Sequence, residues 1–370
     1  MSTDSNSTQE MQNEEVEGLG TDEDFYWKHY PIDTFLIRSE TRTVYDVLRR
    51  ISQDQYVLDP EFQREFIWKP LQQSKLIESV LMRIPLPVFY LAEDKDGRMV
   101  VVDGLQRLST FRNFVEDGLS LQLKNRPELN GKKFQDLSPK LKNRIEDCNL
   151  TMYVIDAKVQ ERARLDIFER VNSGVPLTRQ QMRNSLYSGA GTRFLKAEVN
   201  SAIFLKTTGG SLRSDTMRDR EFVNRFCGFQ LLSFDAYRGD MDEFLAQVLE
   251  RMNQSDQETL DSLSKELRNG LQNNFDVFER HAFRKHYTRR QRRSVINASL
   301  WDVMVTGLSR LPCELVKERA EHLRSAFYNL MDDEDFMDSI TYGTNDTKRV
   351  ERRFKTAHGV IQEVFDDHPA

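Results

Sequence analysis

The pattern of apolar positions predicts three helices in the first third of the chain. Apolar residues recur every three or four positions over residues 43–51, 70–83 and 105–117, which is the spacing of one helix face. Pro70 stands where the first turn of a helix accepts proline, and Gly118 follows the third segment as a C-terminal stop. Each segment is therefore predicted to be an amphipathic helix.

Short apolar runs rich in β-branched residues predict strands between these helices. Residues 84–104 contain two such runs separated by the turn sequence DKDG, a pattern typical of a hairpin. TMYVIDA (151–157) is a further strand, and ERARLDIFERVN (161–172) has helical periodicity. Thr178 and Gln181 have the spacing of a capping box that starts another helix. From about residue 190 onward the pattern is almost entirely helical.

Together these elements predict an α+β chain, in which an N-terminal unit with a small mixed sheet is followed by a mainly α-helical C-terminal unit. Apolar residues make up 38% of the chain and charged residues 30%, with a mean hydropathy of -0.63. The longest apolar runs have the length of strands, and the N-terminus carries no signal-like segment. We therefore expect a cytoplasmic protein with no membrane partner.

The acidic residues are concentrated at the start of the chain. Residues 1–25 contain eight Asp and Glu and no Lys or Arg, so leaving them out changes the net charge from -6 to +2. This stretch has few apolar groups to offset the entropy lost on ordering. We therefore predict a disordered acidic tail at 1–25, which either acts as a solvated end or competes with anions for a basic site.

The segment VVDGLQRLST (101–110) joins the second hairpin strand to the following helix. Backbone N–H groups in the first turn of a helix have no intrahelical partner, so such a junction can hold an anion. Gly104 would let the backbone approach a ligand, and Arg107 offers a positive fork suited to phosphate oxygens. Asp103 suits a metal, a ribose hydroxyl or an arginine. Alternatively, Asp103 only caps the helix and Arg107 forms a surface salt bridge.

Three segments, in this order, resemble one known family. FQREFIWKPLQQSKLIESVLMRIPLPVFYL (62–91), VVDGLQRLST and IFERVNSGVPLTRQQMRNSLYSG (167–189) are similar to the N-terminal domain of GmrSD-type restriction systems, also called the DGQQR family. The resemblance covers about residues 40–230 and implies a ParB/sulfiredoxin-like nucleotide-binding domain there, followed by a helical domain at 231–370. It also implies a nucleotide-hydrolysing role in bacterial defence against foreign DNA.

The DGQQR motif matches Asp103, Gly104, Leu105, Gln106 and Arg107. The resemblance therefore makes Asp103, Gln106 and Arg107 the catalytic candidates. It also makes Asp103, Gly104 and Arg107 nucleotide ligands, and it implies an NTP of unknown base with Mg²⁺ as cofactors. Leu105 replaces the first Gln of the motif, and this removes a group able to position water. The motif in this chain therefore supports nucleotide binding more strongly than hydrolysis.

The two flanking motifs add further candidates to the same site. The upstream motif matches Phe62, Gln63 and Arg64, and the downstream motif contributes Asn172. By this resemblance Gln63, Arg64 and Asn172 are nucleotide-binding residues, with Arg64 as a second phosphate ligand. Phe62 and Trp68 have the rings to stack on a base, although large aromatic residues beside a proline are more often part of the core.

A second candidate site is the stretch HAFRKHYTRRQRR (281–293), which has six cations and no acid. Such a run can neutralise several DNA phosphates, with Tyr287 among them to stack or hydrogen-bond. The alternative is a solvated helix face paired with acids elsewhere, and the family's link to DNA defence favours DNA. The candidate nucleic-acid ligands are Arg284, Lys285, Arg289, Arg290, Arg292 and Arg293.

The leading hypothesis is a nucleotide-binding, NTP-hydrolysing module whose nucleotide state governs DNA engagement or a nuclease partner subunit. One alternative is a non-enzymatic ParB-like DNA-binding protein, and another is a Mg²⁺-dependent endonuclease with an unrecognised acidic site. No HExxH motif is present, and no His-centred nuclease motif follows residue 230. Nuclease activity is thus expected from a partner, and a homo-oligomer stays open.

Overall fold

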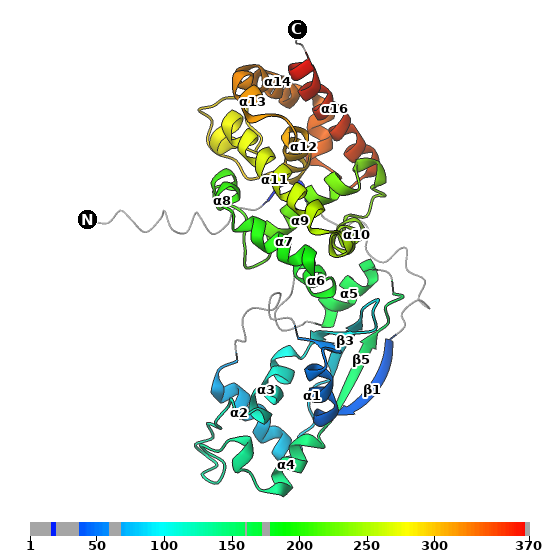
Figure 1. Ribbon diagram of the computed structural model, residues 1–370, viewed down its shortest axis with the longest axis vertical. Coiled ribbons are helices and arrows are strands. Elements are labelled where there is room, and N and C mark those ends of the chain that lie inside the picture. The colour runs from blue at the N-terminus through cyan, green and yellow to red at the C-terminus, as the bar shows by residue number, and fades with distance from the viewer. Residues whose placement is uncertain (1–15, 20–36, 59–67, 160, 172–177, 367–370) are drawn as a thin grey trace, which may run out of the picture. The chain divides into compact units, whose positions relative to one another are not determined.

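The computed structural model describes residues 16–19, 37–58, 68–159, 161–171 and 178–366. The chain divides into two compact units, which we call the N-terminal domain and the helical domain (Figure 1). The N-terminal domain is His29–Leu186, and the helical domain combines Met1–Lys28 with Tyr187–Ala370. In the part of the chain described, no helix has both the length and the apolar character needed to cross a membrane.

Five strands form one mixed sheet in the N-terminal domain. Their spatial order is β1 (Ile37–Thr43), β5 (Asn149–Ile155), β3 (Phe89–Glu93), β4 (Met99–Asp103) and β2 (Tyr56–Val57). β1 pairs with β5 and β3 with β4 in antiparallel fashion, whereas β5 with β3 and β4 with β2 are parallel. The predicted hairpin is confirmed as β3 and β4.

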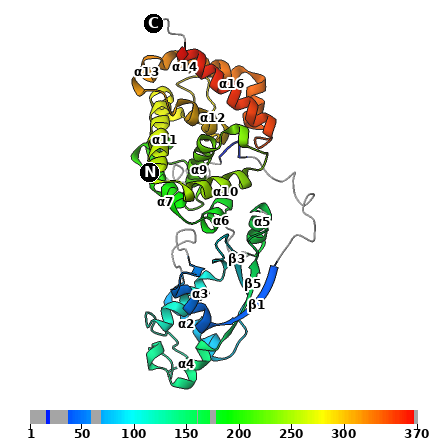
Figure 2. The ribbon, with the colours of Figure 1, turned by 45° about the vertical axis from the view of Figure 1, so that its right-hand side comes forward.

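Four helices of the N-terminal domain cover one face of this sheet (Figures 1 and 2). They are α1 (Val44–Ser52), α2 (Pro70–Leu81), α3 (Leu105–Val115) and α4 (Pro139–Glu146). Their buried apolar side chains form one core with those of the strands, as amphipathic helices packed on a sheet should. The three helices predicted from periodicity correspond to α1, α2 and α3.

The described part of the N-terminal domain has two further α-helices, α5 (Glu161–Val171) and α6 (Arg179–Leu186). The predicted capping box at the start of α6 is confirmed. The Thr178 backbone N–H donates to Gln181 Oε1 at 2.7 Å, and the Gln181 N–H donates to Thr178 Oγ1 at 3.2 Å. These reciprocal bonds satisfy donors that a helix start leaves open.

The helical domain contains ten described α-helices around a single core. The all-helical pattern predicted after residue 190 is confirmed. α12 (Ala298–Leu308) is buried almost all round and carries the buried Trp301, as expected of a central helix. The others are α7 (Ala190–Val199), α8 (Ala202–Thr208), α9 (Arg218–Leu231), α10 (Met241–Gln254), α11 (Gln257–Phe278), α13 (Cys313–Glu318), α14 (Ala320–Asp332), α15 (Glu334–Thr341) and α16 (Thr347–Asp366).

The division between the two units falls after Leu186, whereas the predicted domains met at 230 and 231. The physical reason is the packing of α7, α8 and α9. Their apolar side chains, including Phe194, Phe204 and Phe222, belong to the same core as Trp301, and the rings of Phe204 and Phe222 lie edge-on to the indole. Residues 187–230 are thus part of the helical domain.

Arg225, Asp302 and Arg353 form a fully buried charged cluster inside the helical domain. Asp302 on α12 accepts hydrogen bonds from Arg225 of α9 at 2.5 and 2.8 Å, and from Arg353 of α16 at 3.0 Å. All three side chains are 0% exposed in their ion pairs. One carboxylate therefore links three helices and is the counter-charge of two arginines.

Residues Val16–Leu19, which we call the N-terminal strap, pack against the helical domain. Glu17 pairs with the chain before α12, donating its N–H to the Ile296 carbonyl at 2.9 Å and accepting from Ala298 N–H at 2.8 Å. Its carboxylate forms an ion pair with Lys285, and the flanking apolar side chains of the strap contact the core. The prediction of a disordered tail at 1–25 is therefore wrong for the strap. The rest of that tail lies outside the described residues.

Candidate functional site

The predicted strand-to-helix junction is present at the end of β4. β4 ends at Asp103, Gly104 is the N-cap with φ of 102°, and α3 starts at Leu105. No side chain caps this helix start, so the alternative in which Asp103 caps α3 is wrong. The junction brings Asp103, Gly104, Gln106 and Arg107 together, as the motif predicted.

Gly104 is required by the packing beneath the junction. A Cβ atom built at this position would lie 2.3 Å from Cδ1 of Phe89 on β3, and the left-handed backbone is a conformation that favours glycine. The ring of Phe89 therefore fills the space where a side chain at residue 104 would stand. The structure gives Gly104 this internal role, beyond the close approach to a ligand that the sequence suggested.

Arg107 donates hydrogen bonds to acceptors within the protein. Its guanidinium donates through Nη1 to the Pro87 carbonyl, and through Nη2 to the Val88 carbonyl at 3.1 Å and to Asp103 Oδ2 at 2.8 Å. It also lies over the Phe89 ring, 4.2 Å from the centroid. Burial lowers the pKa of Arg107, and the neighbouring Asp103 charge opposes this. Arg107 thus clamps the start of β3 to the start of α3.

Asp103 is the member of this pair that faces solvent. Its side chain is 37% exposed, against 10% for that of Arg107. The ion pair therefore fixes a carboxylate at the surface beside the open first turn of α3. Leu105 is buried in the core, so the position at which this chain departs from the DGQQR motif points away from that surface.

Gln106 ties the junction to the segment that enters α2. Its Oε1 accepts a hydrogen bond from the Trp68 backbone N–H at 3.3 Å, and Gln73 Nε2 donates to the Trp68 carbonyl at 2.7 Å. Trp68 itself is half-buried against the core, consistent with a core role for this ring. Phe62, Gln63, Arg64 and Asn172 lie outside the described residues.

The basic segment 281–293 is an irregular loop that begins with the last residue of a short 3-10 turn (Glu279–His281), so the helix face of the alternative interpretation is absent from it. Arg284 is fully buried and donates to the Ser294 and Thr208 carbonyls at 2.7 and 3.2 Å. Arg293 donates to the same Thr208 carbonyl at 2.9 Å. Both arginines hold the C-terminal end of α8. The burial of Arg284 contradicts its predicted role as a DNA ligand, whereas Arg293 is half-buried and its role stays a prediction.

The other cations of the segment have different surroundings. Lys285 is bound to Glu17 and to Thr341 Oγ1, so it too is engaged within the domain. Arg289, Arg290 and Arg292 are exposed. Arg289 has only long, exposed ion pairs, with Glu279 at 3.4 Å and Glu321 at 3.3 Å. The cations still available to an anionic partner are therefore Arg289, Arg290 and Arg292.

Two histidines of this segment are stacked inside the helical domain. His281 and His286 lie with ring centroids 4.8 Å apart, and burial lowers the pKa of His286 to about 4. In the described part of the chain no group of three or more His, Cys, Asp or Glu is placed to hold a metal. The pair is thus part of the packing among Phe278, Phe327 and Tyr328.

Protonation of His286 makes the free energy of unfolding depend on pH. The folded protein keeps this imidazole neutral, while the unfolded chain protonates it below its ordinary pKa near 6.5. The contribution of neutral His286 to the free energy of unfolding is thus fully present above pH 6.5. It is lost as the pH falls from 6.5 to about 4, and it does not change further below that. We expect His286→Phe to remove a loss of about 3 kcal/mol between pH 7 and pH 4. Urea unfolding of both proteins at several pH values measures it, and parallel profiles would contradict it.

Comparison with known proteins gives one match. Residues 44–188 match the family model for the N-terminal domain of the GmrSD restriction endonuclease. The match ends close to the last residue of the N-terminal domain, Leu186, and is shorter than the resemblance at 40–230. No curated protein and no solved structure matched the chain.

Proposed function

We propose, on the premise that residues 44–188 belong to the family of the GmrSD restriction endonuclease N-terminal domain, that this domain binds a nucleotide with Mg²⁺. The family makes the chain a component of a restriction or defence system. The observation that carries the proposal is the surface carboxylate of Asp103, fixed by Arg107 beside the uncapped first turn of α3. That turn offers backbone N–H groups to phosphate oxygens.

The charge of Asp103 decides in which form a nucleotide binds. A carboxylate repels phosphate unless a cation lies between them, and Mg²⁺ is commonly held by one or two carboxylates together with substrate phosphates. Asp103 fits that role, with the phosphates and water supplying the other oxygens. When bound, the ion would neutralise charge on the phosphates. Arg107 acts here as a positioning residue that holds Asp103 and the turn.

The remaining residues of the motif extend the proposal. Gln106 would position an attacking water, and Arg64, Gln63 and Asn172 would add ligands to the phosphates and sugar. Hydrolysis of the NTP and coupling to DNA or a nuclease subunit follow from the family's setting. The base of the NTP, a cytoplasmic location and a homo-oligomer stay predictions.

The first test is equilibrium binding of the four labelled NTPs to the full chain, with and without Mg²⁺. Asp103→Asn keeps an oxygen that can accept from Arg107, yet removes the charge. We expect wild type to bind at least one NTP more tightly with Mg²⁺, and Asp103→Asn to lose roughly tenfold or more of that affinity. A matched control is Asp96→Asn on the β3–β4 turn, whose side chain is 80% exposed.

The outcomes separate the competing functions. A folded wild-type protein that binds no NTP, or an Asp103→Asn variant that keeps the Mg²⁺ effect, contradicts the proposal. The exposed Arg289, Arg290 and Arg292 favour a second candidate, a DNA-binding protein without nucleotide chemistry. It predicts DNA affinity that falls steeply with salt and is the same with and without NTP.

A further inference from the structure

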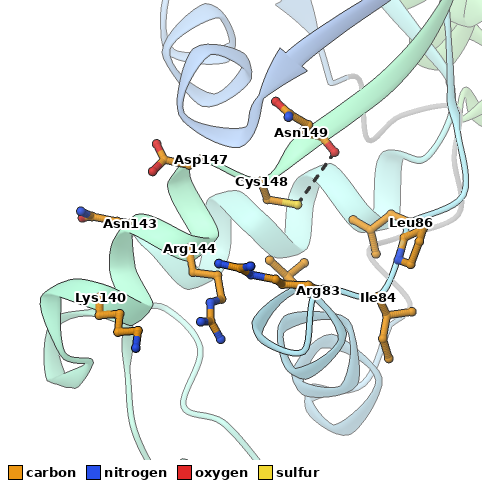
Figure 3. A pocket seen from close by; sticks show the side chains of 11 residues that line it. Arg83, Ile84, Leu86, Lys140, Asn143, Arg144, Asp147, Cys148 and Asn149 are labelled. Carbon is orange, nitrogen blue, oxygen red and sulfur yellow. Dashed lines mark hydrogen bonds between the residues drawn. The ribbon is translucent and has the colours of Figure 1, made fainter.

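A cleft with a volume of about 570 Å³ lies in the N-terminal domain (Figure 3), and none of the junction residues 103–107 lines it. Its walls come from the C-terminal end of α2, from α4 and from the start of β5. The side chains of Arg83 and Arg144 reach toward the same part of the cleft. Lys140, Asn143 and Asn149 also line it.

The charge in this cleft is mostly positive and unpaired. Three cations, Arg83, Lys140 and Arg144, line it together with one acid, Asp147. Among the described residues, Arg83 and Lys140 have no ion pair, and Arg144 has only a hydrogen bond from Nη1 to the Leu81 carbonyl at 2.8 Å. Several other arginines of the domain, such as Arg126 with Glu78, have a carboxylate partner. Three cations beside a single acid favour an anion between them.

The backbone at Arg83 adds an independent observation. Arg83 follows the C-cap of α2 with φ of 61°, a position and conformation in which helices usually have glycine. A non-glycine residue there is strained, and Asp54 and Asp117 have the same conformation after α1 and α3. The chain thus keeps a long exposed cation where glycine would be easier to accommodate.

We propose that this cleft binds phosphates of a DNA backbone. Guanidinium forks, an ammonium group and two side-chain amides suit phosphodiester oxygens. None of the described residues that line the cleft is aromatic, so a free nucleotide would find no ring on which to stack its base. The choice of DNA rests on the proposed role in a restriction system, while the site is separate from the nucleotide junction.

The test measures binding of a fluorescent DNA duplex to the full chain over a range of salt concentrations. The variants are Arg83→Gly and the double variant Arg83→Gly with Lys140→Ala. Glycine suits the left-handed position, so Arg83→Gly should melt no lower than wild type. We expect the double variant to bind roughly tenfold more weakly and to lower the salt slope by about two. Lys75→Ala is the control, since Lys75 is exposed on α2 but does not line the cleft.

Two results would overturn this inference. One is wild-type DNA affinity and salt slope in the double variant, and the other is a wild-type chain that does not bind the duplex. A loss confined to binding of inorganic phosphate or a mononucleotide would also reject DNA as the ligand. NTP binding by the double variant separates this site from the junction, because it should match wild type. If no NTP binds but DNA binding depends on Arg83 and Lys140, only the nucleotide proposal fails.

Discussion

Replacing Asp302 with asparagine is expected to lower the free energy of unfolding by about 3–5 kcal/mol. The substitution keeps the size of the side chain but leaves Arg225 and Arg353 buried without a counter-charge. Arg225 Nη1 and Arg353 Nε already lack a hydrogen-bond partner in the described structure, so both guanidinium groups depend strongly on the Asp302 carboxylate. Urea unfolding at neutral pH measures the loss.

The control for this prediction is an exposed ion pair in the same domain. Asp335 accepts from Arg352 at 2.8 Å, with side chains 80% and 50% exposed, and such pairs contribute little. Asp335→Asn should therefore leave the unfolding midpoint nearly unchanged. Equal midpoints for Asp302→Asn and wild type would show that the buried carboxylate is not what balances the two arginines.

Replacing Gly104 with alanine is expected to lower the free energy of unfolding by about 2–5 kcal/mol. The left-handed backbone accounts for about 1–2 kcal/mol, and the overlap of the new Cβ with Phe89, 2.3 Å away, adds about 1–3 kcal/mol. Phe89 also supports the guanidinium of Arg107, so the clamp on Asp103 should loosen. Thermal or urea unfolding gives the stability, and NTP binding reports on the junction.

Gly97 offers a matched control on the β3–β4 turn. It also has a positive φ, 77°, but a Cβ there would have nothing within 4 Å. Gly97→Ala should therefore show only the backbone cost, about 1 kcal/mol, so the difference between the variants isolates the Phe89 contact. Equal losses would mean that the Phe89 ring moves aside freely.

Local patterns predicted the elements of the N-terminal domain well. Periodicity located α1, α2 and α3, and turn chemistry located the hairpin, because these depend on residues close in sequence. The predicted helix 105–117 ends at Val115, and the left-handed residue is Asp117, with φ of 60°. Gly118 serves instead for a close approach, since a Cβ there would meet Asn113 Oδ1 at 2.1 Å.

The pairing of distant segments could not be read from the sequence. β1 joins the sheet beside β5, more than a hundred residues later in the chain, and no local pattern specifies that register. The position of the domain boundary had the same cause, because the packing of α8 and α9 on Trp301 is a long-range contact. The sequence shows apolar faces but not their partners.

The roles of charged residues were the least predictable. Arg107 has the charge of a phosphate ligand, but its contacts with the Pro87 and Val88 carbonyls appear only when β3 lies beside α3. In the basic segment, equal charges have unequal roles: Arg284 is buried while Arg290 is exposed. No local sequence pattern predicted the cleft at Arg83, because its cations come from two distant segments, the residue after the C-cap of α2 and the helix α4.

The N-terminal strap has a consequence for how the chain folds during synthesis. Glu17 pairs with Ile296 and Ala298, so the ribosome must add on the order of 280 residues before the partner of the strap exists. At about 5–20 residues per second this is a wait of roughly 14 to 56 seconds. The N-terminal domain, made in between, can fold first. The helical domain closes around residues that were synthesised before any of its helices.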